Sequence, residues 1–110
     1  YWTPIAFFKG HFDGGGHTIS GLKIDSTANN QGLFGQCNDA ELSNIQIDGC
    51  IIVSTGVNCG SVAGLIQNST VSNCLSSGEV TAYGDVGGLL GAAYTGTCTV
   101  SNSGSSCNVK

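Results

Sequence analysis

The segment Leu42-Ser43-Asn44 returns as Val71-Ser72-Asn73 and again as Val100-Ser101-Asn102, each time after 29 residues. A repeat of this length that is built from short strands and turns is typical of a solenoid, in which each repeat forms one coil of the chain. One coil cannot bury its apolar face alone, whereas stacked coils bury a continuous core. The repeat therefore predicts a β-solenoid.

A Gly-Leu box precedes each of these segments, at residues 32–35, 63–66 and 87–91. The runs between them alternate apolar and polar residues, as in residues 45–48, which predicts short strands with one buried face. We expect equivalent residues of successive coils to stack in two core columns. The first column holds Leu33, Leu65 and Leu89, and the second holds Leu42, Val71 and Val100.

The three repeated asparagines, Asn44, Asn73 and Asn102, are expected to form a polar ladder at a turn, because asparagine tolerates the left-handed backbone. Neighbouring coils would lie ~4.8 Å apart, so about four coils would give a rod of ~20 Å.

The composition agrees with an all-β chain and excludes several other classes. Among 110 residues there are 18 glycines and 1 proline, and only 9% of the residues are charged. Nearly half of the chain is Gly, Ser, Thr or Asn, which are poor residues for helix interiors. The net charge of −4 and the absence of arginine argue against nucleic-acid partners. No apolar run approaches the ~20 residues of a membrane-spanning helix, so we expect no membrane insertion.

The sequence predicts a single domain over residues 1–110, with a cap or lead-in at residues 1–17 and repeat coils at residues 18–110. Five aromatic residues gather in the lead-in: Tyr1, Trp2, Phe7, Phe8 and Phe12. They are interpreted as a cap over the open end of the core, since exposed core edges need covering. The alternative is an aromatic platform that stacks on sugar rings.

Residues 8–22, FKGHFDGGGHTISGL, resemble the opening of GLUG-motif repeat regions, and residues 86–91, VGGLLG, resemble a later box of that family. Residues 73–80, NCLSSGEV, are similar to the pattern between boxes, with Leu75 in place of an aromatic. The resemblance implies a short right-handed parallel β-helix in extracellular or cell-surface proteins, including adhesins. The departures are Gly15 in a variable slot, Ala63 in the second box, and the cysteines.

The chain has six cysteines and no Cys-x-x-Cys pair, which argues against a zinc ribbon or a thioredoxin-type site. An even number in a chain of extracellular type predicts up to three disulfides with 15 possible pairings. The alternative is that some of the thiols are small core residues. The candidates are Cys37, Cys50, Cys59, Cys74, Cys98 and Cys107.

No constellation of catalytic residues is recognisable, and no cofactor or metal site is predicted. His11, Asp13 and His17 are close in sequence, but nothing forces their side chains to converge, so they are interpreted as structural. Asn68-Ser69-Thr70 is an N-glycosylation sequon in a predicted turn, which makes Asn68 a candidate for modification.

Three functions follow from these observations. The first is a non-catalytic extracellular structural module of a cell-surface protein, or a filament of copies stacked head to tail. Its partners would be copies of itself or adjacent repeats, because an uncovered coil presents unpaired strand edges. The second is an adhesin or carbohydrate-binding module, with glycans as partners. The third, a compact β-helix enzyme, would require carboxylates that converge in one groove.

Overall fold

The computed structural model describes residues 2–94 and 96–109, and within them it contains strands and no helix. The strands form three parallel sheets, which we call A, B and C. Sheet A contains β1 (Phe8–Asp13), β4 (Phe34–Ser43), β7 (Ala63–Gln67), β8 (Thr70–Ser72), β11 (Leu90–Ala93) and β12 (Thr99–Ser101). Sheet B contains β2 (Thr18–Ser20), β3 (Lys23–Ser26), β5 (Gln46–Ser54), β9 (Leu75–Thr81), β13 (Gly104–Ser105) and β14 (Asn108–Val109). Sheet C contains β6 (Val57–Cys59) and β10 (Gly84–Val86).

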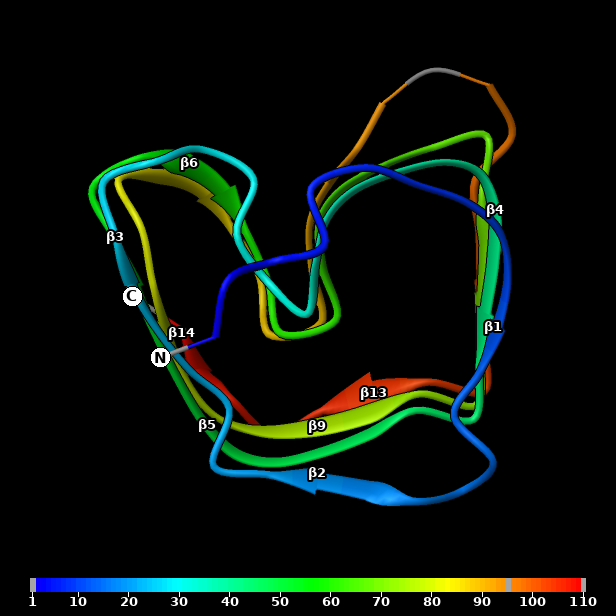
Figure 1. Cartoon of the computed structure of the whole chain (residues 1–110), viewed down its shortest axis with the longest axis horizontal. Helices are drawn as coiled ribbons and strands as arrows, with labels where there is room; N and C mark the ends of the chain where they lie inside the picture. Colours follow the sequence, from blue (N-terminus) through cyan, green and yellow to red (C-terminus); the bar gives the residue numbers. More distant parts are fainter. Residues whose placement is uncertain (1, 95, 110) are drawn as a thin grey trace.

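The chain is a short parallel β-helix, as predicted. Each strand pairs in parallel with the equivalent strand of the next coil, so the coils superimpose when viewed down the axis (Figure 1). The chain makes about three full turns, and sheets A and B each have four levels of strands. The molecule measures 20 Å along its shortest axis, which agrees with the predicted length of the rod.

One of the two predicted core columns is confirmed in register. Phe12, Leu42, Val71 and Val100 face one another on successive coils of sheet A. Leu42 and Val71 are fully buried, whereas Val100 is 49% exposed. The expectation that Val100 is buried is wrong because it lies on the last coil, which no further coil covers in this structure.

The alignment of the second column is wrong by two residues. Phe34 pairs with Ala63 and Ala63 with Leu90, so Leu33 stacks on Val62 and then on Leu89. Leu65 lies instead opposite Gln36 and Ala92. Leu33 and Leu65 are buried and Leu89 is partly buried, so all three contribute to the core although they do not share a column.

The last glycine of each box, rather than its leucine, sets the register. Before sheet A every coil turns inward and then outward again, which notches the cross-section of the solenoid (Figure 1). Gly64 passes so close to the neighbouring leg of this loop that a Cβ atom would lie 2.7 Å from the backbone of Asn30. Glycine is required at such a close approach of two backbones.

The predicted asparagine ladder is confirmed. Asn44, Asn73 and Asn102 have φ angles of 54°, 51° and 48°, and they occupy the corner between sheets A and B. The backbone N–H groups of Asn44 and Asn73 donate to Ser72 O and Ser101 O one coil further on, both at 3.1 Å. A second left-handed ladder, which the sequence reasoning missed, consists of Asn30, Asn58 and Asp85.

Replacement of Asn73 tests the backbone origin of this ladder. An alanine in the left-handed region costs about 1–2 kcal/mol, whereas glycine adopts that region freely. We therefore expect Asn73→Gly to keep the free energy of unfolding close to that of the parent and Asn73→Ala to lower it by about 1 kcal/mol or more. Urea unfolding monitored by far-ultraviolet circular dichroism measures both values. Equal losses in the two variants would show that the side chain matters, not the φ angle.

The lead-in closes one end of the solenoid. Trp2 N–H donates to Lys23 O at 2.7 Å, and Ile5 N–H donates to Leu33 O at 3.2 Å, so residues 2–7 cross the end of the first coil (Figure 1). The cap is shorter than predicted, because β1 within residues 1–17 already pairs with β4 as the first strand of sheet A.

Candidate functional site

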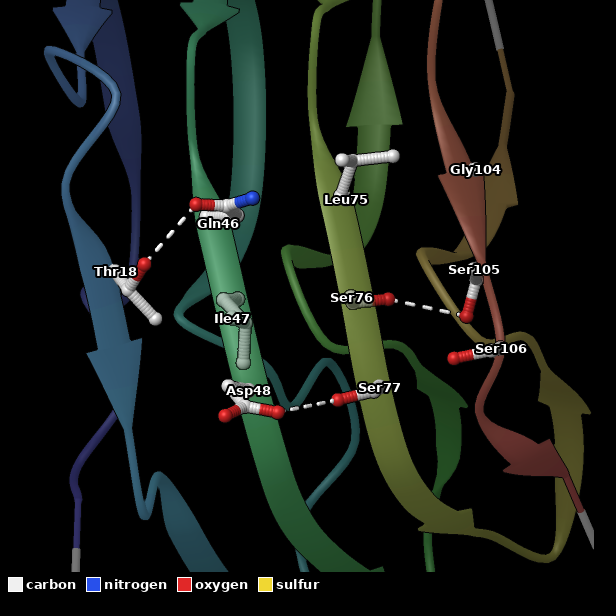
Figure 2. Close-up of a pocket in the computed structure, with 10 residues that line it drawn as sticks. All are labelled: Thr18, Gln46, Ile47, Asp48, Leu75, Ser76, Ser77, Gly104, Ser105 and Ser106. Carbon is white, nitrogen blue, oxygen red and sulfur yellow. Dashed lines mark hydrogen bonds between the residues drawn. The ribbon is translucent and has the colours of Figure 1, made fainter.

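The largest surface hollow is a groove of about 490 Å³ on the solvent-facing side of sheet B (Figure 2). It crosses β2, β5, β9 and β13, so its length runs along the solenoid axis. The residues that line it are Thr18, Gln46, Ile47, Asp48, Leu75, Ser76, Ser77, Gly104, Ser105 and Ser106.

Two rows of outward-facing residues form the sides of the groove. Gln46 pairs in register with Leu75, and Leu75 with Gly104, one coil apart. Thr18 Oγ1–H donates to Gln46 Oε1 at 3.0 Å, which extends this row to the first coil. In the second row, Ser77 Oγ–H donates to Asp48 Oδ1 at 2.9 Å and accepts a 3.0 Å bond from Gly49 N–H.

The floor of the groove is held from inside the solenoid. Ser76 is only 5% exposed, and its hydroxyl lies 3.0 Å from both Gly88 O and Ser105 Oγ. Gly88 lies on the inward loop before sheet A, so this contact ties the floor of the groove to the opposite wall of the solenoid. The floor is therefore rigid, and the two rows above it supply the exposed chemical groups.

The groove combines hydroxyl and amide groups with one carboxylate and one apolar side chain. Asp48 is the only charged residue among those that line it, and neither Lys9 nor Lys23 is one of them. Leu75 is 49% exposed because its neighbour on the next coil is Gly104, which has no side chain to cover it.

The sequence reasoning did not single out this groove. Its rows follow the 29-residue spacing of the repeat: Gln46, Leu75 and Gly104 in one row, and Asp48, Ser77 and Ser106 in the other. The signal was therefore present in the sequence, but only the pairing register shows that both rows face solvent on the same sheet.

The predicted disulfides are not confirmed. All six cysteines lie in the described part of the chain, and no disulfide joins any two of them. Cys37, Cys50, Cys59 and Cys74 are buried, while Cys98 and Cys107 are partly buried. Burial raises the pKa of Cys37 to about 12 and favours the neutral thiol. These cysteines therefore act mainly as small core residues, which was the alternative interpretation.

Cys74 shows how a thiol takes the place of a hydroxyl in the repeat. Its Sγ–H donates to Ser72 O at 3.3 Å, and one coil later Ser103 Oγ–H donates to Ser101 O at 2.8 Å. The same bond from residue i to residue i−2 thus recurs at 29-residue spacing with either side chain.

Cys50 and Cys107 meet across an intervening glycine. Gly78 pairs with Cys50 on one side, and Cys107 occupies the equivalent position on the other, next to the Glu79–Asn108 pair. Because Gly78 has no side chain, the two thiols come into contact in the space it leaves. Burial and the neighbouring thiol together raise the pKa of Cys50 to about 12.

The aromatic residues of the lead-in divide into two groups. Phe8 and Phe12 pack on Phe34, with ring centroids 5.0 Å and 5.4 Å apart, and they close the core as the cap interpretation predicts. Trp2 and Phe7 are 40% and 52% exposed. Tyr1 lies outside the described residues.

The histidines and the nearby carboxylates form no convergent centre. His11 Nδ1 lies 2.7 Å from Glu41 Oε2 on the exposed face of sheet A. Asp13 binds Asn44 Nδ2 and Gly15 N–H, and these bonds hold the pKa of the Asp13 carboxyl below its usual value. Across the described residues no three His, Cys, Asp or Glu side chains gather as metal ligands would.

Asn68, the candidate for glycosylation, is exposed at a corner of sheet A between β7 and β8. Its Nδ2 donates to Asp39 Oδ1 at 2.6 Å, and its Oδ1 accepts a 3.4 Å bond from Thr97 N–H. The side chain thus links three coils. A glycan on Nδ2 would have to preserve or replace the bond to Asp39.

Comparison with known proteins gives one sequence relative. No family model and no solved structure matches the chain, and among the described residues there is no helix able to cross a membrane. Over 86 residues, 76% of this chain, the sequence is 43% identical to Halomucin from Haloquadratum walsbyi (strain DSM 16790 / HBSQ001). The match spans 1% of the length of Halomucin, so the chain resembles one short stretch of that protein.

Proposed function

We propose that the chain is a non-catalytic, extracellular structural module, one section of a solenoid rod in a cell-surface protein. The observation that carries this proposal is the difference between its two ends. The first coil is closed by its lead-in, whereas the last coil has half-covered core residues, such as Leu89 and Leu90. Their counterparts one coil earlier, Val62 and Ala63, are fully buried.

The uncovered coil offers the edges of β11, β12, β13 and β14 to another coil of the same kind. The earlier coils show what such a neighbour supplies, because the edge of β9 is paired along its length with the preceding β5. We infer that the partner is an adjacent repeat. Head-to-tail stacking of copies is the less favourable arrangement, since it would displace residues 2–7 from the capped end.

The relative supports the placement outside the cell. The chain is 43% identical to a short stretch of a protein named Halomucin, and mucins are extracellular proteins. The resemblance of residues 8–22 to GLUG-motif repeat regions remains a prediction that points the same way. A non-catalytic role agrees with the scattered carboxylates of the described residues, which form no acid–base pair in the groove.

Adding one coil tests the structural role. Val80 pairs with Val109, so repeating residues 82–110 after residue 110 continues the 29-residue register. We expect the added coil to fold, to raise the midpoint of urea unfolding, and to slow hydrogen exchange in β11 and β14. A scrambled copy of the same 29 residues is the matched control. An added coil that exchanges as fast as the scrambled one would contradict the proposal.

The groove on sheet B favours the second function, a carbohydrate-binding module, over the enzyme that the sequence also allowed. Exposed hydroxyl, amide and carboxylate groups there could bind a ligand without any chemical step. The two functions are compatible, because stacking uses the open end of the solenoid and the groove lies on its side.

A further inference from the structure

We propose that the groove on sheet B binds a neutral, extended glycan chain that lies across the strands, along the solenoid axis. The inference deepens the carbohydrate-binding function and is independent of the stacking of coils. It assigns binding to the two rows over β2, β5, β9 and β13 instead of the aromatic residues of the lead-in.

The geometry of the two rows fits a repeating polymer. Adjacent strands of the sheet lie ~4.8 Å apart, so a chain that crosses them meets an equivalent pair of positions at every coil. On one side it would meet Thr18, Gln46 and Leu75, and on the other Asp48, Ser77 and Ser106. A compact small molecule would use only part of an open groove of about 490 Å³.

The polar groups in the groove suit the hydroxyl groups of a sugar. Thr18 occupies Gln46 Oε1, and the amide nitrogen of Gln46 points away from Thr18 toward Leu75 (Figure 2). Asp48 Oδ1 is bound by Ser77, while its second oxygen is turned to the other side and can accept from a ligand (Figure 2). The groove thus offers a donor and an acceptor that are already held in place by neighbouring side chains.

Leu75 supplies the apolar contact. A pyranose ring has one face of C–H groups, which gains from covering an exposed aliphatic side chain. Leu75 is 49% exposed in the middle of the first row, between Gln46 and Gly104. Gly104 leaves room above it for a ring to approach.

Charge and topology exclude other polymers. The lining residues include one carboxylate and no cation, so an anionic polymer such as a nucleic acid or a sulfated glycan would be repelled. A peptide that binds by strand addition needs an unpaired edge. Within the groove β5 and β9 are paired on both sides, so no such edge is available there.

Nuclear magnetic resonance titration of the whole chain tests the proposal. The probes are four neutral oligosaccharides, cellohexaose, maltohexaose, mannohexaose and chitohexaose, with a heparin oligosaccharide as the anionic comparison. We expect at least one neutral probe to shift the amide signals of Gln46, Asp48 and Leu75, and heparin to leave them unchanged. Failure of all four neutral probes to bind at millimolar concentration would overturn the proposal and leave the stacking role intact.

Two matched variants place the site. Leu75→Ser and Ile51→Ser each remove an exposed aliphatic side chain from sheet B, but only Leu75 lies in the groove. We expect Leu75→Ser to weaken binding of the responding probe about tenfold and Ile51→Ser to leave it unchanged. Gln46→Ala should weaken binding to a similar degree.

Other results would contradict the inference. Binding that is equal in Leu75→Ser and the parent would move the site elsewhere, for example to Trp2 and Phe7. Concentration-dependent dimerisation that Leu75→Ser abolishes would identify the groove as a contact between copies of the chain.

Discussion

Replacing Phe34 with alanine is expected to lower the free energy of unfolding by about 3–5 kcal/mol, the range typical of a large aromatic side chain removed from a core. Phe34 is fully buried, and it holds Phe8 and Phe12 of the first coil against β4. Its loss would leave a cavity at the point where the first coil joins the second. A domain of this size has a total stability of only about 5–15 kcal/mol, so the effect would dominate.

Phe7→Ala is the matched control, because Phe7 is 52% exposed and belongs to the same aromatic segment. We expect it to change the free energy of unfolding by no more than about 0.5 kcal/mol. Trp2, the only tryptophan, adds a local signal, since its Nε1–H donates to Leu33 O next to Phe34. Equal stability of the two variants would contradict the view that Phe34 anchors the cap.

Trp2 fluorescence and far-ultraviolet circular dichroism should be followed in the same urea titration. In Phe34→Ala we expect the fluorescence transition to occur at lower urea than the loss of strand signal. The reason is that the cap depends directly on Phe34, while the later coils retain their own nearest-neighbour contacts. Coincident transitions would show that the solenoid unfolds as one unit.

Replacing Gly78 with alanine is the second change with a large expected effect. Gly78 has a φ angle of +126°, and a Cβ atom there would overlap the backbone oxygen and nitrogen of Cys50. The variant combines backbone strain of about 1–3 kcal/mol with an overlap that forces β5 and β9 apart. We expect a total loss of roughly 3 kcal/mol or more in the free energy of unfolding.

Gly10→Ala separates these two causes. Gly10 also has a positive φ angle, +109°, but no atom lies within 4 Å of its would-be Cβ. We expect Gly10→Ala to show only the strain and Gly78→Ala to lose about 1–3 kcal/mol more. Urea unfolding with a reductant present measures both. Similar losses in the two variants would show that Cys50 can move aside and that the close approach carries no energetic weight.

The alkylation rate of Cys107 gives an independent measure of the same contact. Cys107 lies on the far side of Gly78 from Cys50, and its Sγ is 3.4 Å from both Ser76 Oγ and Gly88 O. If the alanine pushes the coils apart, Cys107 should react with iodoacetamide faster in Gly78→Ala than in the parent. The rate in Gly10→Ala should match the parent.

The repeat predicted the fold because its period reflects the coil itself. Leu42, Val71 and Val100 are 29 residues apart in the sequence and directly opposed in the structure. The asparagine corner was predictable for a local reason, since few residues other than glycine and asparagine accept a φ angle near 50°. Local conformation and repeat length are both properties that a single sequence carries.

The groove and the box register were not predictable in the same way. Leu65 was matched to Leu33 and Leu89 by residue type, whereas the register is set by how closely Gly64 approaches Asn30. Which of Gln46 and Ile47 faces solvent depends on a bend at Gly49, where φ is +67° and the pairing with β9 shifts. Both are contacts between segments distant in the sequence.

The sequence by itself determined the all-β class, the 29-residue coil, the asparagine corners and the aromatic closure of one end. Each of these follows from periodicity, composition or the conformational preference of single residues. Only the tertiary structure decided that the cysteines lie in different core columns without disulfides and that Val100 is uncovered. It also decided that two polar rows meet on sheet B. The physical reason is that these features depend on the register between coils, which is fixed by close packing across the interior of the solenoid.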